Sequence, residues 1–84
     1  MNYLIGTQIQ KSELKNYIGK KIIYLFSRDI DKSGRGYFFP RCGVISSCKA
    51  RTIEFDETQN YHSLTDFKEA VEATPENIKA NFPN

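Results

Sequence analysis

The chain has little of what a membrane-spanning or secreted protein requires. No stretch approaches the roughly 18 uninterrupted apolar residues of a membrane helix. Its opening, MNYLIGTQIQ, lacks the charged start and the long apolar middle of a secretion signal. We therefore expect a cytoplasmic protein that contacts no membrane.

Cysteine is also scarce, with only Cys42 and Cys48 among 84 residues. A small secreted domain of this size usually carries about four or more, so the low number agrees with a cytoplasmic location. If both cysteines lie on one extended strand, they are separated by about 20 Å, which is too far for a disulfide. We predict two reduced thiols.

Groups that could perform catalysis are few. The single histidine, His62, is followed directly by Ser63, and adjacent residues on a strand point to opposite faces. One histidine, two distant cysteines and no dense pair of carboxylates provide no zinc site either. A chain of 84 residues also leaves little room for a large enclosed active site. We predict a single domain that is not an enzyme and needs no cofactor.

Charge is present in quantity but is unevenly distributed. The net charge is only +2, yet residues 1–51 hold ten of the twelve lysines and arginines and a net charge of +7, whereas residues 52–84 have a net charge of −5. This asymmetry either produces a basic face and an acidic face, or cancels as the two halves pack together.

Apolar runs separated by turn residues predict a mainly β fold. Residues 20–28, KKIIYLFSR, contain five consecutive apolar residues, which predicts a strand that is covered on both faces. Residues 37–48 form a second extended run, in which Pro40 and Gly43 indicate an edge position, a bulge or a bend.

Two further strands are expected in the next part of the chain. In residues 51–57 the apolar Ile53 and Phe55 alternate with polar residues, which is typical of a half-exposed strand. Residues 58–64, TQNYHSL, read as a turn followed by a short fourth strand.

Helix signals lie near the two ends. Ser12 is a candidate cap for one short helical turn that Gly19 would end, although this segment fits an extended lead-in equally well. Residues 64–73 fit either a helix or a last strand, and their Ala, Glu and Lys content favours the helix. Thr74 as cap and Pro75 at the first helical position predict a helix that ends near the terminus.

The segments YIGKKIIYL and CGVISSCKARTIEF resemble the first strand and the following hairpin of SH3-like small barrels of the KOW and Tudor type. In those barrels one glycine precedes the first strand and another starts the second. The resemblance covers residues 17–67 and implies a small SH3-like antiparallel barrel, or a partly open sheet of 4–5 strands, with short C-terminal helices in a tail over residues 64–82. The long insertion at residues 28–40 departs from the KOW pattern, and no residue-level function is transferred.

Residues 29–40, DIDKSGRGYFFP, contain part of a calcium-loop pattern. Asp29, Asp31, Ser33 and Gly34 occupy four of its positions, but Pro40 stands where the loop requires a bidentate glutamate. The surrounding cations outnumber the two aspartates. We therefore expect these residues to form a turn rather than a calcium site.

The same loop combines cations with aromatic rings. Such cations can contact phosphates, and an exposed ring can stack on a base, although aromatic residues in a short strand also commonly belong to the core. We predict a binding surface for nucleic acid, to which Lys20, Lys21, Lys49 and Arg51 could contribute. The alternative is a protein partner bound through an SH3-like groove or the acidic tail. The candidate residues are Arg28, Lys32, Arg35, Tyr37, Phe39 and Arg41.

Overall fold

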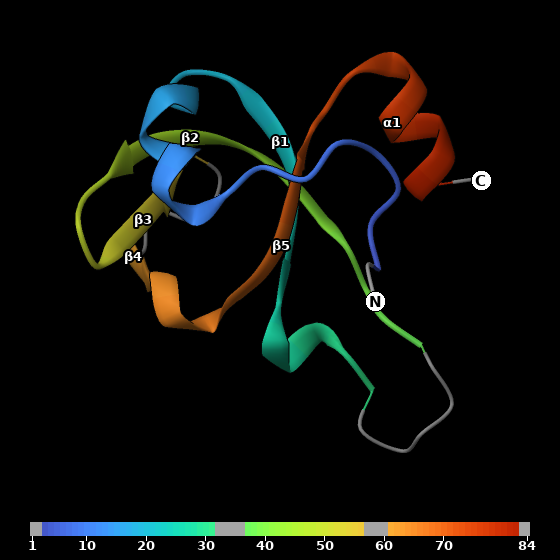
Figure 1. The fold of residues 1–84 in the computed structure, drawn as a ribbon, viewed down its shortest axis with the longest axis horizontal. Coiled ribbons are helices and arrows are strands. Elements are labelled where there is room, and N and C mark those ends of the chain that lie inside the picture. The colour runs from blue at the N-terminus through green and yellow to red at the C-terminus, as the bar shows by residue number, and fades with distance from the viewer. Residues whose placement is uncertain (1–2, 32–36, 57–60, 83–84) are drawn as a thin grey trace.

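The computed structural model describes residues 3–31, 37–56 and 61–82 of the chain. Its described strands form one antiparallel sheet in the order β4-β3-β2-β1-β5, with β4 and β5 at the two edges (Figure 1). The sheet is therefore open, and the prediction of a mainly β fold with a partly open sheet is confirmed. The strands are β1 Lys21–Phe26, β2 Arg41–Cys48, β3 Thr52–Phe55, β4 Tyr61–Ser63 and β5 Phe67–Glu72.

Strand β1 is the most buried part of the sheet, because it pairs with β2 on one side and β5 on the other. Every residue of β1 after Lys21 is buried. Ile22, Tyr24 and Phe26 enter one core cluster, whereas Ile23 and Leu25 enter another. The apolar run of the sequence thus reflects a strand with both faces covered, as predicted.

The cluster that contains Ile22, Tyr24 and Phe26 is the larger of the two and holds most of the aromatic packing. The rings of Tyr24 and Phe55 are stacked with their centroids 4.0 Å apart and their planes 8° apart. Phe26 and Phe67 meet edge to face with centroids 5.1 Å apart. Such pairs contribute about 0.5–1.5 kcal/mol each beyond the burial of apolar area. Leu14, which lies in the short helix over Lys11–Tyr17, also belongs to this cluster.

The second cluster is covered by the two ends of the chain. Helix α1, Pro75–Asn81, and the N-terminal segment lie on the same side of the molecule (Figure 1). The backbone N–H groups of Tyr3 and Leu4 donate to the Glu69 carboxylate at 2.7–2.9 Å. The Asn81 amide exchanges two hydrogen bonds with the backbone of Ile5, at 2.8 and 2.9 Å. These polar contacts fasten the N-terminal segment across β5 and α1.

Three short 3₁₀ helices, η1 Lys11–Tyr17, η2 Ser27–Asp29 and η3 Leu64–Asp66, complete the described elements. The helix expected near Ser12 is present, but it begins at Lys11 and has no side-chain cap. Gly19 follows it with a φ of +85°, a conformation that favours glycine. Thr74 caps α1 as predicted, since its hydroxyl accepts from the N–H of Asn77 at 3.1 Å. No helix in the described residues is long and apolar enough to cross a membrane.

The helix favoured over residues 64–73 is wrong beyond Asp66. Only η3 is helical there, and the following residues form β5, in which Phe67, Ala70 and Val71 are buried. Pairing with the edge of β1 that β2 leaves free satisfies the backbone hydrogen bonds of β5 and buries its apolar residues. This gain from tertiary contacts outweighs the helix propensity of the segment.

The extended run expected over residues 37–48 is divided at Pro40. An isolated bridge joins Ile30 to Phe38 before the proline, and β2 begins directly after it. Strand β2 is internal rather than an edge, and Gly43 pairs in regular register with Ile22. The register of β2 against β3 shifts between Ile45 and Ser47, beyond the two residues from which a bulge was expected. Cys42 and Cys48 lie at opposite ends of β2 and are free thiols.

Candidate functional site

The predicted loop surface is only partly within the described residues. Lys32 and Arg35 lie outside them. Tyr37 and Phe39 are 59% and 67% exposed, so both rings, rather than one of them, are accessible. Phe38 between them turns inward, and its ring centroid lies 5.3 Å from that of Tyr3. The loop therefore presents two aromatic side chains on one face of a short extended segment.

Arg41 is held by a buried acid. Its Nε and Nη2 groups donate to the two carboxylate oxygens of Asp29 at 2.9 and 2.8 Å. The backbone N–H of Phe26 donates to the same carboxylate at 3.0 Å. Burial alone would raise the pKa of Asp29, but these hydrogen bonds and the charges of Arg41 and Arg28 together hold it below its ordinary value. Arg41 thus joins β2 to η2, and its charge is compensated.

Arg28 is also engaged within the fold. Its guanidinium carbon lies 4.3 Å from the centroid of the Phe26 ring, in cation–π contact. One of its terminal nitrogens is 3.9 Å from a carboxylate oxygen of Asp66, and both side chains are about half exposed. Two of the predicted site residues, Arg28 and Arg41, therefore contact acids and the same aromatic ring.

His62 lies beside these arginines. Its ring centroid is 4.9 Å from that of Phe26, and its Nε2 atom is buried without a hydrogen-bond partner among the described residues. Burial lowers its pKa, and the positive charges of Arg28 and Arg41 lower it further, with a smaller opposing effect from Asp66. The imidazole is neutral at pH 7. It serves as packing, and no three metal-ligating side chains gather anywhere in the described part of the chain.

A basic concavity lies elsewhere, beside η1. Its central hollow, of about 500 Å³, lies between η1, the turn joining β2 to β3, and η3. Two further hollows share Lys11 and Ser12 with it, one extending toward Lys49 and the other toward Lys68. We call the three together the η1 groove. Its charged lining residues are Lys11, Lys15, Lys49, Arg51, Lys68 and Glu69.

Local hydrogen bonds fix the walls of the η1 groove. Leu14 is fully buried and anchors η1 on the sheet, while Lys11 and Lys15 on the same helix line the groove. The N–H of Lys49 donates to the carbonyl of Thr52 at 2.8 Å, which closes the turn that holds Arg51. The N–H of Leu64 donates to the Arg51 carbonyl at 2.9 Å and thereby ties η3 to this turn. The cations are consequently presented by η1, by this turn and, for Lys68, by β5.

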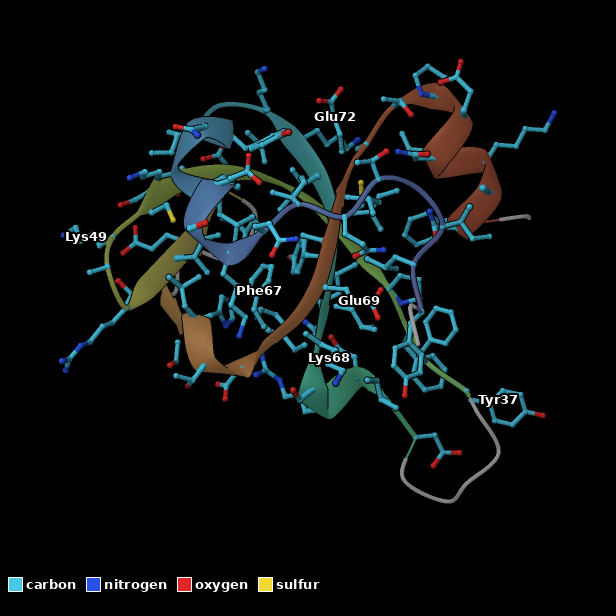
Figure 2. The ribbon with its side chains drawn as sticks, viewed as in Figure 1. Tyr37, Lys49, Phe67, Lys68, Glu69 and Glu72 are labelled. Carbon is cyan, nitrogen blue, oxygen red and sulfur yellow. The ribbon has the colours of Figure 1, made fainter. Side chains whose placement is uncertain are left out.

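The charges of the η1 groove are largely uncompensated. Five cations line it against one carboxylate, Glu69, and that carboxylate already accepts the backbone hydrogen bonds of the N-terminal segment. None of the five cations forms an ion pair within the described ranges, where the pairs are those of Arg28 and Arg41. Figure 2 shows Lys49 and Tyr37 at opposite ends of the molecule, so the Lys49 end of the groove is remote from Tyr37.

The central hollow also has apolar lining residues. They are Leu64, which packs partly buried against the larger core, and the exposed Ala50. Hydroxyl groups of Ser12, Ser63 and Thr65 line the same hollow. The Ser63 and Thr65 hydroxyl oxygens are 2.7 Å apart and hydrogen-bonded. The hollow is therefore lined by apolar side chains and hydroxyl groups, with cations around them.

Cys48 lines the hollow that extends toward Lys49 but is not a reactive thiol. Burial raises its pKa, and the nearby charge of Lys15 only partly opposes this effect. The thiol is therefore protonated at neutral pH. What the groove offers chemically is cation and hydrogen-bond contacts rather than a nucleophile.

The η1 groove was not identified from the sequence, because its cations come from distant parts of the chain. The only signal was the charge excess of residues 1–51, and Lys49 and Arg51 were expected beside the loop instead. Comparison with family models, curated proteins and solved structures finds no match to this chain.

Proposed function

We propose that this chain is a non-enzymatic binding module that holds nucleic acid in the η1 groove. The observation that supports this most is the set of five cations without ion-pair partners in the described part of the chain. Lysine and arginine side chains in such a cluster neutralise phosphates and release condensed counterions. The hydroxyls of the central hollow add further hydrogen bonds of the kind that phosphate oxygens accept.

The loop cations are a less favourable phosphate site. Arg41 would have to give up two hydrogen bonds to Asp29, leaving that buried carboxylate without its charged partner. Arg28 would have to leave the Phe26 ring or share its charge with Asp66. The groove cations have no such contacts to lose in the described structure. This difference moves the proposed site from the loop to the groove.

The proposal is tested by titrating the folded protein with fluorescently labelled oligonucleotides and following anisotropy. If the five groove cations contact phosphates, the logarithm of the association constant should fall by roughly 3 to 5 per tenfold increase in salt. Absence of binding at low salt by a protein with an intact circular dichroism spectrum would contradict the proposal.

A matched pair of substitutions locates the contact. Lys49→Gln removes a groove cation, whereas Lys79→Gln removes an exposed cation on α1, outside the groove. We expect Lys49→Gln to weaken binding about three- to tenfold at low salt and to reduce the salt slope by about one. Lys79→Gln should change both quantities much less. Equal losses would indicate attraction by net charge alone.

A second candidate function is protein binding at the loop surface, favoured by the exposure of Tyr37 and Phe39. Exposed aromatic side chains are common anchors of protein interfaces. The double substitution Tyr37→Ser with Phe39→Ser separates the possibilities. It should leave oligonucleotide binding unchanged if the groove is the nucleic-acid site, and should weaken that binding if the loop is the site. A protein partner at this surface would show little salt dependence.

A further inference from the structure

The central hollow of the η1 groove has a shape that phosphate contacts alone do not explain. Its volume of about 500 Å³ is in the range of roughly 300–1,000 Å³ seen for small-ligand sites, although the hollow is open to solvent and can cover only one face of a ligand. Leu64 and Ala50 are its apolar lining residues, and the alkyl parts of Lys11 and Arg51 can extend that apolar surface. A phosphate gains nothing from an apolar lining, whereas the face of a nucleobase does.

Double-stranded nucleic acid cannot use this hollow. In a duplex the bases are stacked inside, and the strand presents phosphates and sugars on a convex surface. In a single strand a base can be splayed out and enter a concave site. The hydroxyls of Ser12, Ser63 and Thr65 lie at the hollow and can accept hydrogen bonds from a base edge. Ser12 can also donate, and the Ser63–Thr65 pair, whose hydroxyls are bonded to each other, retains one O–H to donate.

We infer that the η1 groove binds single-stranded nucleic acid, with one unstacked base seated on Leu64 and Ala50 and the groove cations on the neighbouring phosphates. This inference rests on the proposed function and specifies its ligand. Among the residues that line the central hollow, none is aromatic. The base therefore packs against an aliphatic side chain, and the site discriminates strand state more than base identity.

Three ligands with the same length of sugar–phosphate backbone test the inference on the full chain at one salt concentration. They are a labelled single-stranded oligonucleotide, the same strand made entirely of abasic sites, and its duplex. We expect the single strand to bind about fivefold more tightly than the abasic strand, the low end of the loss seen when a base loses an aromatic platform, because the platform here is aliphatic. The single strand should also bind more tightly than the duplex. Equal affinity for the single strand and either of the other two ligands would overturn the inference.

The outcomes separate this inference from the proposed function. If all three ligands bind equally and with a steep salt dependence, the phosphate site stands and the base site does not. If none of them binds, the proposed function itself fails, and with it the inference.

Substitution in the apolar lining of the hollow gives a second measurement. Leu64→Ser should remove the advantage of the single strand over the abasic strand while leaving abasic affinity unchanged, because the cations stay in place. Leu64→Met, which retains an apolar side chain, should keep that advantage. Equal behaviour of the two variants would contradict the placement of the base. Should Leu64→Ser fail to fold, the three-ligand comparison on the natural chain still decides.

Discussion

The two basic regions of the molecule differ in what their cations already contact. At the loop end, Arg41 is bound to Asp29, and Arg28 lies on the Phe26 ring near Asp66. In the η1 groove, Lys11, Lys15 and their neighbours have no acid partner in the described structure. The same residue types therefore stabilise the fold in one region and are available to a ligand in the other. The availability of a cation depends on its neighbours, which a count of charges does not reveal.

The largest expected effect concerns the anchor of the groove. Leu14→Ala should lower the free energy of unfolding by about 2–5 kcal/mol, because it removes a fully buried side chain from the larger core. It should also weaken oligonucleotide binding, since η1 presents two of the groove cations. Urea unfolding and anisotropy measure the two effects. The near-isosteric Leu14→Met should largely preserve both, and a fully stable Leu14→Ala variant would contradict the packing described here.

A somewhat smaller effect is expected at the loop end. Asp29→Asn should cost about 2–3 kcal/mol of stability, because the Arg41 guanidinium loses its charged partner next to the core. At a temperature where the variant is folded, its affinity for oligonucleotides should not decrease. The matched control is Asp66→Asn, whose exposed pair with Arg28 at 3.9 Å should be worth no more than about 0.5 kcal/mol. Loss of binding in the folded Asp29→Asn variant would show that the two regions are not independent.

The pH dependence of the free energy of unfolding should report the protonation of His62. Its pKa is lowered in the folded protein by burial and by Arg28 and Arg41, with Asp66 opposing. The unfolded state therefore binds more protons once the pH falls below about 6.5, and stability should decline from there toward the folded pKa. The lowered pKa of Asp29 affects stability only at more acidic pH, around and below its ordinary value of 3.8. Urea midpoints at about pH 7.5 and 5.5 should converge in a His62→Phe variant. An unchanged pH dependence in that variant would contradict the assignment.

The smallest effect is expected for Arg28→Gln. It removes one exposed, partly compensated cation, so stability should change by less than about 1 kcal/mol. Oligonucleotide affinity should change by less than about twofold, in contrast to Lys49→Gln. A larger loss from Arg28→Gln than from Lys49→Gln would return the binding site to the loop end.

Elements that form mainly because of residues adjacent in the sequence were predicted correctly from local signals. The apolar run of β1 and the Thr74–Pro75 start of α1 are of this kind, and both are confirmed. Strand β5 was only the less favoured of two alternatives, because its Ala, Glu and Lys residues favour a helix and the strand that it pairs with lies more than forty residues earlier in the chain. The exposure of Tyr37 and Phe39 agrees with the predicted loop surface. The pairing of Arg41 with Asp29 could not be predicted, because it depends on how η2 places a carboxylate beside β2.

The η1 groove could not be located from the sequence for the same reason. Lys11 and Arg51 become neighbours only after Leu14 docks η1 on the sheet and the turn at Lys49 folds back toward η3. The charge excess of the first half of the chain was visible, but its division into compensated and uncompensated cations was not.

The central claim is that the ligand lies in the η1 groove and not at the loop end. It is tested most directly by titrating ¹⁵N-labelled protein with a single-stranded oligonucleotide and mapping the amide chemical-shift changes. We predict that the largest changes occur in η1, at Lys49 to Arg51 and at Ser63 to Thr65, with little change at Tyr37 to Phe39. Large changes confined to Tyr37 to Phe39 and the adjoining η2 would contradict the claim.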